Sequence, residues 1–249
     1  MAQLMRTSNP VLNQKEFTGY AEIGNRMTVE GTVNKTGLLL LCSIATAAWT
    51  WHQFQESHSP AAVMPSLWIG TIGGFICALI TTFKKEWAAV TAPMYALLEG
   101  LALGGISAML ELRFPGIAIQ SVSLTFGTLL VMLLAYRSGL IPVTQRLRMG
   151  IVAATGAIML VYLLQFVLGF FGVHFSTING SGPIGIGFSL IIVGIAALNL
   201  VLDFDMIATG ARMGAPKYME WYGAFGLMVT LVWLYLEIVR LLSKVRGRD

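Results

Sequence analysis

The chain has 249 residues, of which 56% are hydrophobic and only 11% are charged. A soluble domain carries about 25% charged residues, so this composition excludes a soluble globular protein and predicts an integral membrane protein. The formal net charge of +4 is modest and the basic residues gather in short connectors, so we expect no nucleic-acid partner.

The first 35 residues are polar and carry both signs of charge. We interpret residues 1–35 as a cytoplasmic tail without a cleavable signal peptide, because the first apolar run begins too late for one. Cys42 and Cys77 both lie inside later apolar runs, so the sequence predicts no disulfide framework.

Seven apolar segments follow, and each is long enough to cross a bilayer, for which a helix needs about 20 residues. The predicted spans cover residues 36–55, 66–83, 87–110, 117–136, 150–172, 184–207 and a last span that begins between 221 and 226 and ends near 242. The expected fold is therefore an all-α integral membrane bundle of seven transmembrane helices. We assign residues 36–243 to this membrane domain and residues 244–249 to a short basic tail.

The basic residues of the connectors predict the orientation of the chain. If the N-terminus is cytoplasmic, the cytoplasmic segments hold Arg6, Lys15, Arg26, Lys35, Lys84, Lys85, Arg137, Arg146, Arg148, Arg212 and Lys217. The outer loops then hold only Arg113. Cytoplasmic loops of membrane proteins carry an excess of Lys and Arg, so we expect a cytoplasmic N-terminus and a location in the plasma (inner) membrane of a bacterium. Seven crossings leave Arg240, Lys244, Arg246 and Arg248 at the outer side, as an exception to that rule.

Small residues repeat at four-residue spacing in two of the spans, as Gly70 with Gly74 and as Gly100 with Gly104. Such pairs allow the backbones of membrane helices to approach closely. We therefore interpret these glycines as packing positions.

Four acids lie within or beside the spans: Glu99, Asp203, Asp205 and Glu237. An ionised side chain at the centre of a bilayer costs about 3 kcal/mol, so such residues usually face the bundle interior and serve ion or proton pathways. The alternative is a protonated acid that joins two helices through a hydrogen bond. Asp203 and Asp205 point about 200° apart on a helix, so we expect only one of them to face inward. These two acids also fit a solvated helix end.

Glu237 has a local alternative. Arg240 follows it by three residues, so the two side chains share a helix face and are able to pair with each other. Glu99 lies near the middle of the third span and is also a candidate partner of either Asp205 or Glu237.

Two motifs near the end of the chain carry a family resemblance. Phe204-Asp205 lies within LDFDMI on the sixth span, and Leu234-Tyr235-Leu236-Glu237 lies on the seventh. Together with GTVNKTGLLLL at the first span, they make the chain from Thr32 onward resemble the transmembrane Bax-inhibitor-motif family. Glu237 stands where the family has Asp, and the second span has no basic residue to act as a latch.

The resemblance implies a seven-helix fold with the last helix at the centre of the bundle. For bacterial-type members it implies a pH-sensitive calcium leak in which two acids share a proton. Carried over to this chain, Asp205 and Glu237 would be the pH-sensing pair and the candidate calcium ligands. Glu99 and Asp203 are added as further ion-pathway residues.

We therefore expect a pH-sensitive cation (calcium) leak channel gated by buried carboxylates. Its expected partners are the lipid bilayer, cations and protons, and calcium is the one candidate for a bound cofactor. The alternative is a non-conducting membrane regulator that binds a membrane protease or another membrane protein. An enzyme is not expected, because a nucleophile needs a positioned base and Ser107 has only the distant His174 as a candidate.

Overall fold

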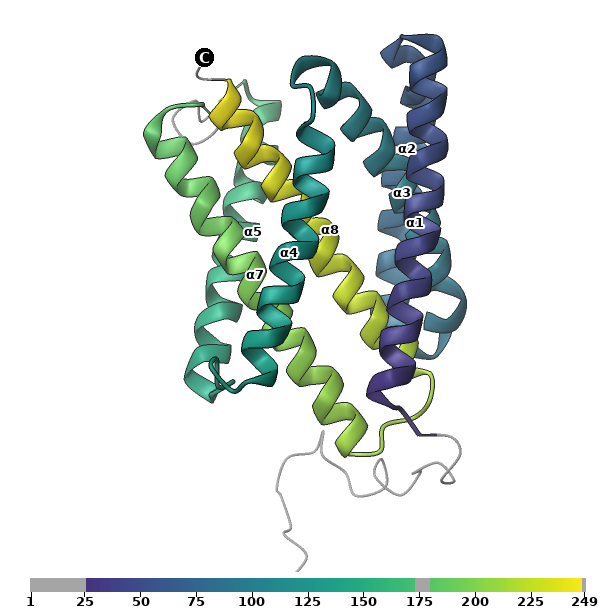
Figure 1. The fold of residues 1–249 in the computed structure, drawn as a ribbon, viewed down its shortest axis with the longest axis vertical. Coiled ribbons are helices and arrows are strands. Elements are labelled where there is room, and N and C mark those ends of the chain that lie inside the picture. The colour runs from purple at the N-terminus through teal and green to yellow at the C-terminus, as the bar shows by residue number, and fades with distance from the viewer. Residues whose placement is uncertain (1–25, 173–179, 248–249) are drawn as a thin grey trace, which may run out of the picture.

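The computed structural model describes residues 26–172 and 180–247, and these form seven α-helices and one short 3₁₀ helix (Figure 1). The elements in chain order are α1 (Val29–Ser57), α2 (Pro60–Phe83), η3 (Lys85–Trp87), α3 (Ala88–Arg113), α4 (Ile117–Arg137), α5 (Gln145–Phe170), α7 (Pro183–Arg212) and α8 (Met219–Arg246). The predicted all-helical class is confirmed. Residues 1–25 of the expected tail, together with His174, Asp249 and Arg248, lie outside the described residues.

Six helices are long and apolar enough to cross a membrane: α2, α3 with η3, α4, α5, α7 and α8. The remaining helix, α1, contains the span predicted at 36–55 and is long enough, but its composition does not meet the criterion for a spanning helix that the other six meet. Its first two turns carry Glu30 and Lys35, and its last turns carry His52 and Glu56. The described residues therefore support six spanning helices by composition, and the seventh predicted span stays a prediction.

Polar side chains cap the starts of α1, α2 and α5. The side chain of Thr28 accepts a hydrogen bond from Gly31 N at the start of α1, and Thr144 accepts one from Leu147 N at the start of α5. A capping side chain satisfies a backbone N–H that has no partner within the helix. At the other end of the chain, α8 continues to Arg246, so Lys244 and Arg246 lie on this helix and extend it beyond residue 243.

The last helix occupies the centre of the bundle. In Figure 1, α8 runs diagonally through the molecule, and it packs against α1, α3, α4 and α7. Of the most apolar stretch of α8, 56% is buried inside the bundle, whereas 11% of the corresponding stretch of α5 is buried. One apolar cluster joins α8 to α7 through residues such as Leu200 and Leu231, and another joins α8 to α1, α2 and α3 through residues such as Leu39 and Met228. Side chains projecting from α8 are therefore placed to contact several other helices.

The glycine pairs are packing positions, as predicted. A side chain at Gly104 would overlap the backbone of Ala47 in α1, and one at Gly70 would overlap the backbone of α3 at Leu98. These close approaches hold α1, α2 and α3 together as a layer on one side of α8. On the other side of α8, α5 packs mainly against α7.

The bundle has two ends, which we call the connector end and the opposite end. The connector end contains residues 213–218, which join α7 to α8, and also the start of α1, where Met27 N donates to Ala215 O at 2.7 Å. The opposite end contains the last turns of α8 (Figure 1). Successive helices alternate in direction between these two ends.

Candidate functional site

Glu237 lies inside the bundle on α8 and is only 1% exposed. Arg240, one turn further along α8, donates from Nη1 to both carboxylate oxygens at 2.7 and 2.9 Å. Tyr162 of α5 donates its hydroxyl to the same carboxylate at 2.8 Å, and the Arg240 guanidinium lies 5.0 Å from the centre of the Tyr162 ring. The local Glu237–Arg240 pair that the sequence suggested is present, and Tyr162 extends it to a second helix.

Asp205 is paired with a different arginine. Arg148, in the first turn of α5, donates from Nη2 to Asp205 Oδ2 at 2.6 Å. The Asp205 side chain is mostly buried, whereas that of Arg148 is about half exposed. This ion pair joins α5 to α7 toward the connector end.

Asp205 and Glu237 do not contact each other in the structure; no hydrogen bond or ion pair between described residues joins them. The reason is their register on two antiparallel helices. At a rise of about 1.5 Å per residue, Asp205 lies about 10 Å before the end of α7, whereas Glu237 lies about 27 Å beyond the start of α8. The predicted shared proton and joint calcium site therefore need an arrangement that this structure does not contain.

Asp203 points to another side of α7. The side chain of Thr230 on α8 lies beside it, whereas the Asp203 oxygen Oδ2 is buried and has no hydrogen-bond partner among the described residues. Asp203 and Asp205 therefore contact different neighbours, as their rotation on the helix requires. The Asp203 side chain is half-buried, and its one buried oxygen without a partner among the described residues was not expected, because Asp203 was expected to matter less than Asp205.

Glu99 lies on α3, facing α2. A side-chain carbon at Gly74 would lie 3.0 Å from Glu99 Oε2, so the glycine makes space for this carboxylate. No hydrogen bond or ion pair reaches Glu99 from the described residues, and neither Asp205 nor Glu237 is its partner. Its role in an ion pathway stays a prediction.

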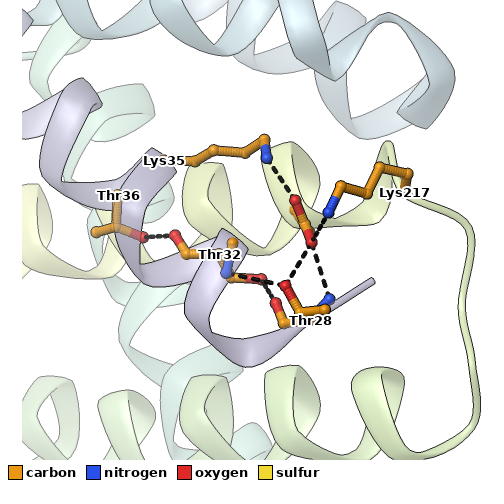
Figure 2. A network of polar contacts seen from close by, with 7 residues as sticks. Thr28, Thr32, Lys35, Thr36 and Lys217 are labelled. Carbon is orange, nitrogen blue, oxygen red and sulfur yellow. Dashed lines mark hydrogen bonds and ion pairs between the residues drawn. The ribbon is translucent and has the colours of Figure 1, made fainter. Parts of the chain in front are cut away.

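A further buried acid, Glu220, was not among the predicted site residues. It lies in the first turn of α8, is 0% exposed, and forms ion pairs with Lys35 of α1 and with Lys217. Thr28 donates to Glu220 Oε1 from both its backbone N and its hydroxyl, at 2.8 Å each. Figure 2 shows Thr28, Lys35 and Lys217 arranged around this carboxylate. The network ties the start of α1 to the start of α8.

Sequence reasoning missed Glu220 because it lies just before the last apolar run, where a charge normally faces water. The available signal was its position relative to Lys35, which flanks the first apolar run. Because the two helices begin at the same end of the bundle, these opposite charges meet.

Ser107, considered above as a nucleophile, donates to the backbone oxygen of Leu103 and shares a hydrogen bond of 2.6 Å with the Tyr235 hydroxyl. This contact joins α3 to α8. Ser107 and Tyr235 also line a cavity of about 570 Å³ between α1, α3, α4 and α8, whose other lining residues are mostly apolar. His174, the residue considered as a base for Ser107, lies outside the described residues.

A search of protein families matched residues 9–247 to the family described as Bax inhibitor 1 like. The chain belongs to this family. The comparisons with curated proteins and with solved structures returned no match.

Membership in the Bax inhibitor 1-like family and the apolar helices together identify a multi-pass membrane protein. The match covers both motifs that carried the resemblance, and the roles expected of Asp205 and Glu237 stay predictions. Among the described residues, no three His, Cys, Asp or Glu side chains lie close enough together to hold a metal ion. What this family member has instead is two carboxylates, each held by an arginine, on the central helix and on its neighbour α7.

Proposed function

We propose that this Bax inhibitor 1-like protein is a pH-sensitive cation leak in the plasma (inner) membrane of a bacterium, with a cytoplasmic N-terminus and calcium as its cargo. The observation that supports the proposal best is that Asp205 and Glu237 are each ion-paired with an arginine inside a bundle of apolar helices. Acids at such positions in membrane proteins usually mark an ion or proton pathway. A packing role alone does not require charge.

In this proposal the arginines hold the pathway closed. A guanidinium and a passing cation compete for the same carboxylate oxygens, so a carboxylate bound to arginine is not available to a cation. Removing one partner of such a pair leaves the other charge without its counter-charge, which is costly where that charge is buried, as the Glu237 carboxylate is. Opening therefore requires that arginine and carboxylate separate together with a movement of α5, α7 or α8.

Protonation supplies such a trigger. Asp205 faces Arg148 of α5 and Tyr136 of α4, and Arg212 of its own helix lies near the same tyrosine. Glu237 faces Tyr162 of α5, Arg240 and the more distant Lys244. A proton on either carboxylate removes its charge and releases its arginine, which is a local electrostatic change able to bias a two-state element. We expect cation flux to change with pH for this reason.

The test is calcium flux into liposomes that contain the purified protein and a calcium-sensitive dye, measured over a range of pH. We expect flux above that of protein-free liposomes, with a pH dependence that Asp205→Asn and Glu237→Gln flatten. Glu56→Gln is the control, because the Glu56 side chain is 72% exposed. Flux at the protein-free level at every pH would contradict the proposal and favour the non-conducting regulator of a membrane protease or another membrane protein.

The same assay decides the role of Glu99. If Glu99 belongs to the pathway, Glu99→Gln lowers flux relative to Glu56→Gln. Flux equal to that of the control would remove Glu99 from the pathway and leave it as a packing residue against Gly74.

A further inference from the structure

A groove lies on the bundle between α1 and α4. It is the cavity of about 570 Å³ in whose wall Ser107 and Tyr235 lie, and its lining comes from α1, α3, α4 and α8. Both α1 and α4 pack against α3 and α8, whereas they do not pack extensively against each other. The two helices therefore form the edges of the groove, and α3 and α8 form its floor.

The groove opens sideways, toward the lipid. Ile44 on its α1 edge is 53% exposed and Phe126 on its α4 edge is 41% exposed, although both side chains line the cavity. Exposed apolar side chains on the flank of a multi-pass membrane protein contact the hydrocarbon of the bilayer. A lipid chain is therefore able to enter the groove directly from the membrane, between these two edges.

The groove has the length of a phospholipid in one leaflet. Its lining on α1 extends from Leu40 to Gln55, which is about 22 Å at a rise of about 1.5 Å per residue. A bilayer measures about 40–45 Å with its head groups, so one leaflet measures about 20–22 Å. Gln55 lies two residues before the end of α1, at the opposite end of the bundle, whereas Leu40 lies near the middle of the helix. The groove therefore reaches from the surface of one leaflet toward the middle of the membrane.

The polarity of the lining changes along this length. Trp51, His52 and Gln55 line the end of the groove that lies at the last turns of α1. Tryptophan is enriched where head groups meet hydrocarbon, and amide and imidazole N–H groups are able to donate to a phosphate oxygen. The lining nearer the middle of the membrane includes the apolar side chains of Leu40 and Met228. A molecule with a polar head and a hydrocarbon chain matches this order.

Most of the hydroxyl groups in the wall are already bonded within the protein. Ser107 and Tyr235 share a hydrogen bond of 2.6 Å, and Thr125 donates to Ser121 O at 2.7 Å. These are three of the four hydroxyl side chains that line the groove, and the fourth is Ser43. Such a wall favours hydrocarbon over a polar solute, because a polar solute would lose its hydrogen bonds to water there.

The size of the groove suits a lipid chain as well. Its volume falls within the range of about 300–1,000 Å³ that is usual for small-molecule sites. An empty groove would leave the side chains around it without neighbours on one side, and so would lose their dispersion contacts. A chain in the groove contacts four helices, whereas a chain on the outer surface of α5 contacts that helix from one side. The groove therefore holds a lipid more firmly than the rest of the bundle surface does.

We propose that the groove is a phospholipid-binding site, in which one acyl chain lies along α8 between α1 and α4 and the head-group phosphate lies at His52 and Gln55. The lipid belongs to the leaflet at the opposite end of the bundle. The inference goes beyond the proposed function and does not depend on it, because it uses none of the acids and arginines of that proposal.

The first experiment is photo-crosslinking in phosphatidylcholine liposomes with two phosphatidylcholine probes. One probe carries a diazirine at the end of an acyl chain, and the other carries it next to the ester group. We expect the chain-end probe to label Leu40 and Met228 and the ester-side probe to label Trp51, as identified by mass spectrometry of peptides. Identical labelling by both probes, or labelling of the groove no stronger than that of the exposed Leu163 on α5, would overturn the site.

The second experiment fills the groove. Ala48→Phe and Val122→Trp place a large ring in it from α1 and from α4. The matched controls are Ala45→Phe and Val131→Trp, at exposed positions of the same two helices outside the lining of the groove. We expect the filling variants to lower labelling of the groove several-fold and the controls to leave it unchanged. Thermal unfolding in detergent checks that each variant is folded, and unchanged labelling in a folded filling variant would overturn the proposal.

The third measurement identifies the bound molecule by native mass spectrometry. We expect one phospholipid per chain to stay bound to protein purified in a mild detergent. It should be retained by Ala45→Phe and lost from Ala48→Phe. Protein that retains a free fatty acid instead, or no lipid at all, would overturn the assignment of a phospholipid. Neither the crosslinking nor the mass spectrometry involves calcium, so a failure to conduct calcium overturns the proposed function and leaves the lipid site standing.

Discussion

The Glu220 carboxylate lies in the space into which a side chain at Gly31 would project, so α1 and α8 meet at this point with no room for a methyl group. Lys35 from the next turn of α1 and Lys217 from the connector bind the same carboxylate. A buried ion-pair network therefore fixes the start of the central helix to the start of the first helix. The arrangement makes Gly31 and Glu220 sensitive to substitution for different reasons.

We predict that Gly31→Ala lowers stability by about 1–3 kcal/mol, the usual cost of overpacking a well-packed site. The added carbon would overlap the Glu220 carboxylate and force it away from its partners. Gly37→Ala on the same helix is the control, because its position is open and alanine is favoured over glycine within a helix by up to about 1 kcal/mol. Thermal unfolding in detergent compares the two variants, and an equal change in Tm for both would contradict the packing described here.

We predict that Glu220→Gln lowers stability by about 3–5 kcal/mol, because it breaks a buried ion pair and leaves Lys35 facing a neutral group. The amide also cannot accept all of the hydrogen bonds that Thr28, Lys35 and Lys217 donate. Glu86→Gln, at an exposed position of η3, is the matched control and should leave Tm unchanged. A Glu220→Gln protein as stable as this control would show that the network does not hold the helices together.

Hydropathy located the helices because the length and apolar character of a spanning segment are properties of consecutive residues. The helical period likewise explains the Glu237–Arg240 pair, because residues three apart share a helix face. The Arg148–Asp205 and Tyr162–Glu237 contacts were not predictable in the same way, because they join residues 57 and 75 positions apart. Such contacts depend on how α5 is placed against α7 and α8, which neither composition nor periodicity specifies.

Glu111 is another residue whose contacts depend on how the chain folds. It lies near the end of α3 and accepts hydrogen bonds from Gly116 N and Ala118 N at the start of α4. A side chain that caps a helix in this way contributes about 0.5–2 kcal/mol to stability. Glu111 is therefore unsuitable as a neutral control for the flux measurements, whereas the exposed Glu56 is suitable.

The basic residues at the end of α8 are a second case in which the sequence alone does not predict what the side chains contact. Arg240, Lys244 and Arg246 are an exception to the expected charge asymmetry if α8 ends outside. In the structure Arg240 binds Glu237, Lys244 donates to Gly185 O, and Arg246 donates to Pro115 O at 2.6 Å. These side chains are engaged by the bundle itself, so their positions on α8 follow from packing.

The orientation of the bundle is tested by the loop between α4 and α5. We predict that a cysteine at Ser138, exposed at the connector end, does not react with a membrane-impermeant thiol reagent added to intact cells, because the basic connectors stay in the cytoplasm. A cysteine at Ser57, exposed at the opposite end, should react readily. The reverse pattern of labelling would place the N-terminus outside.

The most direct test of the proposed closed state is calcium flux through Arg148→Gln in liposomes at neutral pH. Removing the arginine frees the Asp205 carboxylate for a cation and loosens α5 from α7, so we predict flux several-fold above that of the wild type. Arg146→Gln, two residues earlier on α5 and with no ion pair to an acid among the described residues, is the matched control and should conduct like the wild type. Flux through Arg148→Gln that is equal to or lower than that of the wild type would contradict a pathway held closed by arginine.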